Sequence, residues 1–132
     1  MPERRIPAVV AVLMVALAGC GGGHTDGVDG PATVVDLTYS AGGAVKTQTL
    51  DCVGTAAKQG PSCALVKKLP ASAFEPVPKD TMCTMIYGGP ETATIKGQID
   101  GKKVDAKFSR TNGCEIDRFK KVEPLFAEMA GN

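Results

Sequence analysis

Alternating apolar and polar positions, together with β-branched residues, predict two pairs of β-strands. The four candidate strands are residues 32–39, 44–52, 91–99 and 102–110. The first pair is joined through Gly42-Gly43, and the second flanks Asp100-Gly101, a dipeptide favoured in tight hairpin turns. Each pair is therefore expected to fold as an antiparallel hairpin.

Two further segments have the features of helices. A short helix is expected over residues 63–69, with Pro61 at its start and Pro70 beyond its end. A second is expected over residues 115–122, where apolar residues fall on one helical side, and Pro124 should break or restart it. The order of elements indicates an α+β fold, an antiparallel sheet of about five strands with two helices packed on one face.

The N-terminal segment is typical of a signal for export. Arg4 and Arg5 precede an uncharged run, residues 6–19, that is too short to span a bilayer as a helix and ends in small residues. Its end, Leu17-Ala18-Gly19-Cys20, resembles the bacterial lipobox, in which the cysteine is acylated and becomes the new N-terminus. Residues 1–19 are thus predicted to be a lipoprotein signal peptide. The alternative is an ordinary secretory signal that leaves Cys20 as a fifth structural thiol.

Residues 20–31 are rich in glycine and are expected to form a flexible tether between lipidated Cys20 and the domain. His24, the only histidine of the chain, lies in this tether. Nucleophilic catalysis with a histidine base needs that base in fixed geometry, so the position of His24 argues against such an enzyme. Neither an enzymatic activity nor a cofactor is predicted.

The charge of the mature chain gives no reason to expect nucleic acid as a partner. The whole sequence carries 15 basic and 14 acidic residues, and loss of the signal with Glu3, Arg4 and Arg5 would leave 13 of each. A chain near neutrality has no basic surplus for phosphates. The location predicted instead is the outside of the bacterial cell membrane, held by the lipid.

Four cysteines remain for the domain, and they are Cys52, Cys63, Cys83 and Cys114. An exported domain with few aromatic residues is expected to use them in two structural disulfides. Four cysteines allow three pairings, and the sequence alone does not choose among them. Zinc ligands normally come as closely spaced pairs such as CxxC, and none occurs here, so no metal site is predicted.

The most informative segment is residues 81–90, Thr-Met-Cys-Thr-Met-Ile-Tyr-Gly-Gly-Pro. Cys83-Thr84-Met85-Ile86-Tyr87 fits the Cys-x-Met-x-Tyr stretch that bacterial subtilisin-inhibitor-like proteins carry at their reactive site. The spacing of the four cysteines is also similar to theirs. The chain therefore resembles this family of serine protease inhibitors over most of residues 32 to 126, and residues 32–132 are expected to form such a domain.

The resemblance implies two disulfides, Cys52 with Cys63 and Cys83 with Cys114. The partner it implies is an extracellular subtilisin-like serine protease. A homodimer is compatible with the resemblance, since family members are often dimers.

The resemblance also implies a reactive loop with the scissile-like bond between Met85 and Ile86, and a hydrogen bond from Asn112 that supports the loop from behind. Such a loop occupies a protease cleft as an extended strand with one side chain in the specificity pocket. Thr84 and Ile86 are β-branched and favour extended backbone, while Met85 is apolar and adaptable. Met85 would suit an apolar pocket of the subtilisin or chymotrypsin kind.

Two other interpretations remain open at this point. The apolar residues around Cys83 could form a core strand, and Asn112-Gly113 could be a plain turn before a helix. The family loop usually continues with aspartate and proline after the tyrosine, whereas Gly88-Gly89 follows Tyr87 here and would loosen the loop. The alternative function is accordingly a membrane-anchored envelope binding or structural lipoprotein that keeps the fold without inhibitory activity.

Overall fold

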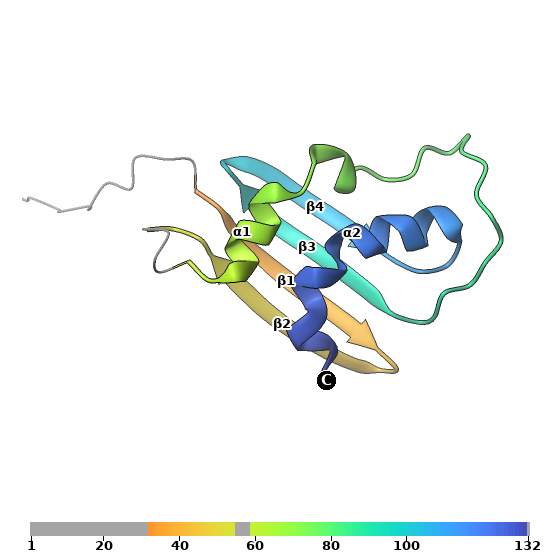
Figure 1. The fold of residues 1–132 in the computed structure, drawn as a ribbon, viewed down its shortest axis with the longest axis horizontal. Helices are drawn as coiled ribbons and strands as arrows, with labels where there is room; N and C mark the ends of the chain where they lie inside the picture. The colour runs from red at the N-terminus through yellow and green to blue at the C-terminus, as the bar shows by residue number, and fades with distance from the viewer. Residues whose placement is uncertain (1–31, 55–58, 132) are drawn as a thin grey trace, which may run out of the picture.

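The computed structural model of the protein describes residues 32–54 and 59–131. They form a four-stranded antiparallel sheet with the spatial order β2-β1-β3-β4 (Figure 1). The strands are β1 (Val34–Ala41), β2 (Ala44–Asp51), β3 (Thr92–Ile99) and β4 (Lys102–Phe108). The helices are α1 (Pro61–Lys68), the 3₁₀ turn η1 (Ala71–Ala73) and α2 (Gly113–Ala130). The predicted signal peptide, lipidated Cys20, tether and His24 lie outside the described residues.

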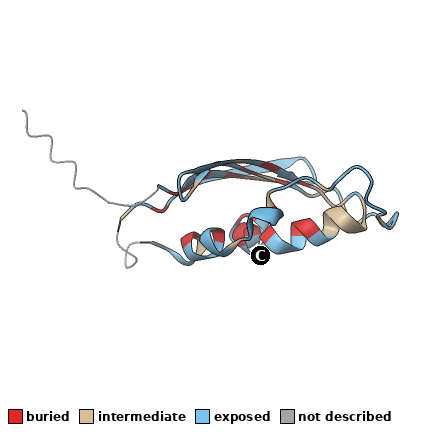
Figure 2. Ribbon diagram, turned by 90° about the horizontal axis from the view of Figure 1, so that it is seen from above, coloured by how far each residue is buried: buried red, intermediate tan, exposed pale blue. Residues whose placement is uncertain are grey.

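The sheet is covered by helices on one face only, as the edge-on view in Figure 2 shows. Alternate residues of the strands point to that face, so Leu37 of β1, Ile95 of β3 and Ala106 of β4 form a buried row across three strands. From α2, Phe119, Val122, Leu125, Phe126 and Met129 close the other side of the core. The outcome is the expected α+β fold with one hydrophobic layer between sheet and helices.

The number of strands differs from the expectation of about five. The segment between η1 and β3 forms no ladder with the sheet, and in Figure 1 it runs as an irregular loop around the far end of the molecule. In a sheet, successive residues of a strand form a regular ladder of backbone hydrogen bonds with the neighbouring strand. This segment instead forms isolated backbone hydrogen bonds with other parts of the domain. Four strands, not five, make up the described sheet.

The prediction that Pro124 would break or restart the C-terminal helix is wrong. Helix α2 continues through Pro124 to Ala130, and Figure 1 shows it changing direction in its second half. Proline inside a helix removes one backbone hydrogen bond and favours a bend. The packing of Leu125, Phe126 and Met129 against the sheet stabilises the turns beyond the bend.

The turn predicted at Asp100-Gly101 is confirmed, since both residues have positive φ angles, 49° and 75°. This turn lies beside the first described residues, because Gly101 N donates a hydrogen bond of 2.9 Å to Ala32 O. Among the described residues, no helix is both long enough and apolar enough to cross a membrane.

A glycine inside β3 is required by the close approach of β1. Gly97 has a φ of +139°, and a Cβ atom there would overlap the carbonyl oxygen of Val34 and lie 2.9 Å from Val35 Cα. We expect Gly97→Ala to lower the free energy of unfolding by about 2–5 kcal/mol, because backbone strain and overpacking add. Urea unfolding measures the change.

The matched control is Gly60→Ala, since a Cβ at Gly60 would have no neighbour within 4 Å and φ there is −68°. Gly60→Ala should lower the free energy of unfolding by less than about 1 kcal/mol. Equal losses for the two variants would contradict the role assigned to Gly97.

Candidate functional site

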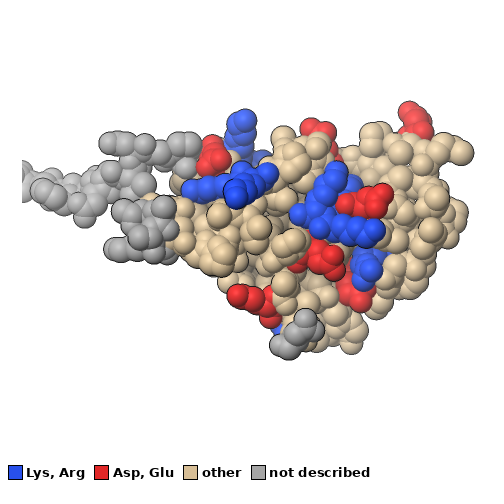
Figure 3. All heavy atoms as spheres, viewed as in Figure 1, with Lys and Arg blue, Asp and Glu red and all other residues tan. Residues whose placement is uncertain are grey.

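Four of the exposed large apolar side chains of the described residues cluster in one loop, residues 82–87. Met82, Met85, Ile86 and Tyr87 expose 96%, 94%, 59% and 67% of their surface. This exposure excludes the alternative in which the segment is a buried core strand. Figure 3 shows the end of the molecule that carries the loop as a largely uncharged surface on the viewed side. Contiguous exposed apolar surface typically marks a site of interaction.

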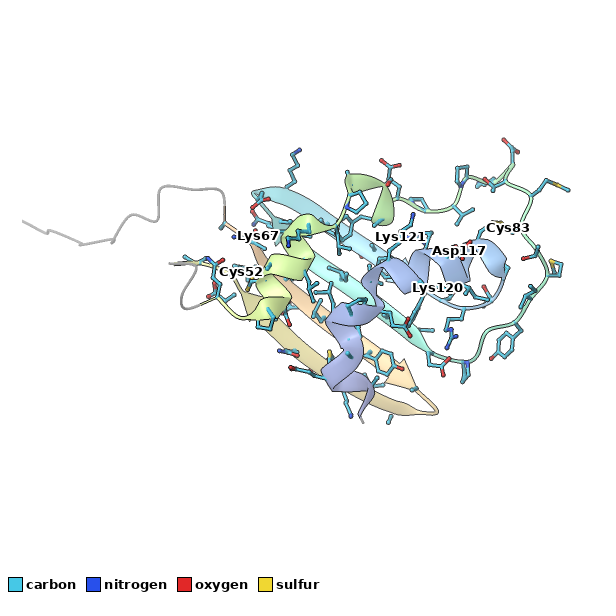
Figure 4. The ribbon with its side chains drawn as sticks, in the orientation of Figure 1. Cys52, Lys67, Cys83, Asp117, Lys120 and Lys121 are labelled. Atoms are coloured by element: carbon cyan, nitrogen blue, oxygen red, sulfur yellow. A yellow bond between two sulfur atoms is a disulfide. The ribbon has the colours of Figure 1, made fainter. Side chains whose placement is uncertain are left out.

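The N-terminal side of the loop is fixed to the start of α2 by a disulfide and a hydrogen bond. Cys83 is bonded to Cys114 with a Cα–Cα distance of 5.4 Å, as the resemblance implied. One residue on, Thr84 O accepts a hydrogen bond of 2.9 Å from Gly113 N. Figure 4 shows Cys83 next to the first turns of α2, where Asp117 and Lys120 are labelled. A Cβ on Gly113 would collide with the Thr84 side chain, so glycine permits this close approach.

The C-terminal side of the loop is fixed to the segment between β4 and α2. Gly88 N donates a hydrogen bond of 2.7 Å to Arg110 O. A Cβ on Gly88 would lie only 2.9 Å from Ile116 Cδ1 and 3.1 Å from Arg110 Cβ, so the glycine is packed against both residues. Gly89 has a φ of +130°, which other residues rarely adopt. The two glycines therefore fit the course of the chain here, and the expectation that they loosen the loop is not supported by these contacts.

The side chain of Arg110 also holds the chain that follows the two glycines, through contacts with Glu91 and Phe119. Its guanidinium Nη1 lies 3.3 Å from Glu91 Oε2, and both side chains are about three-quarters shielded from solvent, at 31% and 26% exposure. The same guanidinium lies 5.8 Å from the centroid of the Phe119 ring in α2. Partial shielding strengthens such an ion pair relative to one in open solvent. Arg110 thus connects the residue after Pro90 to the helix.

Met85, Ile86 and Tyr87 form the span between the two fixed points, Thr84 and Gly88. Behind them lies a groove of about 440 Å³ between the loop and α2. It is lined by Met82, Thr84, Ile86, Gly113, Cys114, Ile116, Asp117 and Lys120. Within residues 32–54 and 59–131, no group of three or more His, Cys, Asp or Glu side chains is placed to hold a metal ion. The arrangement leaves the side chains of Met85, Ile86 and Tyr87 exposed on a short segment that is fixed at both ends.

In the structure, the hydrogen bond of the Asn112 side chain is made with α2 and not with the loop. Its side-chain oxygen accepts a hydrogen bond of 2.9 Å from Glu115 N and caps the start of α2. The backbone hydrogen bond to the loop is donated by the neighbouring Gly113, whose N–H binds Thr84 O. Asn112 therefore stabilises the first turn of the helix that carries Gly113 and Cys114. A supporting role for its side chain at the loop itself stays a prediction.

Sequence reasoning missed the parts played by Gly88, Arg110, Gly113 and Ile116. One signal was present, since an asparagine followed three residues later by Glu115 marks a helix start and would have placed Gly113 in the first turn. The contacts of Gly88 and Arg110 depend on elements far apart in the sequence and left no local pattern.

The second disulfide, Cys52–Cys63, also has the pairing that the resemblance implied, with a Cα–Cα distance of 5.6 Å. It joins the end of β2 to the first turn of α1, and both cysteines are buried at 3% and 5% exposure. Two disulfides indicate that the domain matures in an oxidising environment.

No match to this chain was found among protein-family models, among curated proteins or among solved structures.

Removal of the Arg110 side chain should loosen the C-terminal side of the loop without unfolding the domain. In Arg110→Ala we expect the Gly88 amide to exchange with solvent about fivefold faster, because the Glu91 ion pair and the Phe119 contact are lost. Hydrogen exchange followed by NMR measures this rate.

Lys96→Ala is the matched control, since it removes a more exposed ion pair, with Asp105 at 3.9 Å, from the sheet. The Gly88 exchange rate should be the same in this variant as in the wild type. Unchanged exchange in Arg110→Ala would show that the ion pair does not hold the loop.

Proposed function

We propose that the protein inhibits serine proteases of the subtilisin or chymotrypsin kind through a substrate-like loop, Cys83 to Tyr87. Met85 enters the primary specificity pocket, and the bond between Met85 and Ile86 takes the position of the scissile bond. The observation that carries this proposal is the 94% exposure of Met85 between two fixed points. The resemblance to subtilisin-inhibitor-like proteins is part of the proposal.

The fixed points give the loop the rigidity that separates an inhibitor from a substrate. Ordering one residue of a flexible segment costs about 1–2 kcal/mol, and Thr84 and Gly88 are already held before a protease binds. A pre-ordered loop loses less entropy on binding, so an interface of standard size can be tight. The disulfide Cys83–Cys114 keeps the N-terminal side in place even if a protease cuts the loop.

Cleavage of Met85–Ile86 would leave both new ends attached to the same framework. The acyl side is held through Thr84 and Cys83, and the amine side through Gly88 and its contact with Arg110. The effective concentration of a tethered amine is high, so resealing of the peptide bond competes with loss of the products. The hydrogen bonds that flank the loop thus support slow release.

The proposed setting is the outer side of the bacterial membrane, with lipidated Cys20 as the anchor. The chain reaches the sheet at Ala32, which is bonded to the β3–β4 turn, whereas the loop leads into the opposite end of β3. Eight residues of β3 separate the two ends by about 25 Å. An anchor at residue 20 would leave the loop at the end of the domain remote from the attachment.

The proposal is tested by titrating subtilisin with the purified protein. Activity should fall linearly to a stoichiometric end point, and Met85→Asp should abolish this, because a carboxylate is costly to bury in an apolar pocket. Val45→Asp is the matched control, since Val45 is 63% exposed in the edge strand β2, which β1 separates from β3. Rapid cutting at Met85–Ile86 without inhibition would instead favour an envelope lipoprotein that keeps the fold.

A change of specificity gives a second, independent test. The trypsin pocket contains a carboxylate, so Met85→Lys should become a trypsin inhibitor and lose affinity for subtilisin. Inhibition titrations with both proteases measure the exchange. Met82→Lys adds the same charge to the same loop at a residue that is 96% exposed, and it should not inhibit trypsin. Equal trypsin inhibition by both variants would remove Met85 from the primary pocket.

A further inference from the structure

The three methionines of the described chain differ sharply in exposure. Met82 and Met85 are 96% and 94% exposed, whereas Met129 is 6% exposed in the core under α2. A thioether reacts with peroxide only where the oxidant reaches the sulfur, so reactivity follows exposure. The domain therefore carries two accessible thioethers, both in the loop, and one protected thioether that serves as an internal reference.

The groups that usually compete for peroxide are already oxidised in this domain. All four cysteines of the described residues are in disulfides, Cys52–Cys63 and Cys83–Cys114. A thiolate is the form of cysteine that peroxide attacks, and a disulfide has none. Within residues 32–54 and 59–131, the loop methionines are consequently the most accessible targets for a mild two-electron oxidant.

We propose that Met85 is an oxidation-sensitive switch, so that peroxide converts the loop from an inhibitory form into one with weak affinity for proteases. The thioether sulfur donates an electron pair to one oxygen of hydrogen peroxide, the O–O bond breaks, and methionine sulfoxide and water are the products. The sulfur is oxidised by two electrons and the peroxide is reduced by two. This proposal deepens the proposed function and rests on it.

Oxidation changes the side chain without disturbing what holds the loop. The fixed points are the Cys83–Cys114 bond and the backbone groups of Thr84 and Gly88, and none of them involves a thioether. The sulfoxide is polar and chiral, so it fits poorly in an apolar specificity pocket that accepts Met85. The fold should persist while the affinity falls by roughly ten- to a hundredfold.

The first experiment maps where oxygen is added, and it does not depend on inhibition. The folded full-length protein is treated with dilute hydrogen peroxide, and the rate of sulfoxide formation at each methionine is followed by peptide mass spectrometry. Met85 and Met82 should react at the rate of a short unfolded peptide, and Met129 at least about tenfold more slowly. Protection of Met85 equal to that of Met129 would overturn the proposal.

The second experiment measures the inhibition constant for subtilisin before and after peroxide treatment of the same sample. The inhibition constant of the wild-type protein should rise by roughly ten- to a hundredfold after treatment. Met85→Leu has no thioether at this position, so its ratio of treated to untreated constants should be close to one, whatever its starting affinity. Met82→Leu retains Met85 and should show the wild-type ratio.

The outcomes separate the two proposals. An untreated protein that does not inhibit removes the proposed function and the switch together. An untreated protein that inhibits, with the same constant after Met85 is fully oxidised, removes the switch alone. Loss of inhibition in peroxide-treated Met85→Leu equal to that of wild type would also overturn it, because another group would then be responsible.

Discussion

The first turn of α2 is the place on which both the core and the exposed loop depend. Asn112 caps the turn, Gly113 binds Thr84, and Cys114 is bonded to Cys83. The turn is in addition fixed to the sheet through Arg118, which is 9% exposed. The Arg118 guanidinium lies 5.0 Å from the centroid of the Phe108 ring and binds both Lys107 O and Glu115 Oε2. Any rotation of α2 against β4 would therefore move the N-terminal side of the loop.

This coupling explains how a domain with one thin hydrophobic layer can keep four apolar side chains in solvent. Exposed methionine, isoleucine and tyrosine side chains gain nothing from burial, and in a free chain they would collapse onto the nearest apolar surface. The disulfide and the two backbone bonds restrict that collapse. Cys83 and Cys114 are 31 positions apart in the sequence, and an unstrained disulfide across that separation stabilises the folded state by about 3–4 kcal/mol. The loop is held by covalent and backbone constraints, so the side chains at 85–87 stay exposed to solvent.

Much of the fold follows from local sequence signals. The four strands, the turn at Asp100-Gly101 and the short helix after Pro61 each have a pattern within a few residues, and each is present in the structure. Where two local rules compete, sequence alone is less reliable. Proline predicts an interrupted helix at Pro124, but the apolar residues that follow it bury against the sheet and the helix continues.

The site was harder to predict because its contacts join distant segments. Cysteine spacing left three pairings open, and only the resemblance to a known family selected the two that the structure contains. From the sequence, Gly88 was expected to loosen the loop, because a glycine without packed neighbours is flexible. The neighbours that fill the space beside it, Arg110 and Ile116, come from another part of the chain. At Gly88 the missing side chain instead permits close packing against Ile116 and Arg110, and Gly88 N donates a hydrogen bond to Arg110 O.

The topology of the sheet also separates the first described residues from the loop. Ala32 lies beside the β3–β4 turn, and the loop lies where β3 begins and β4 ends. In an antiparallel hairpin the start of the first strand lies beside the end of the second, and the turn lies at the opposite end, so the full length of β3 stands between the β3–β4 turn and the loop. If the protein is anchored at Cys20, as proposed, the loop lies at the end of the domain remote from the attachment. A lipid at Cys20 and a protease-binding loop at Met85 are therefore compatible with one another on geometric grounds.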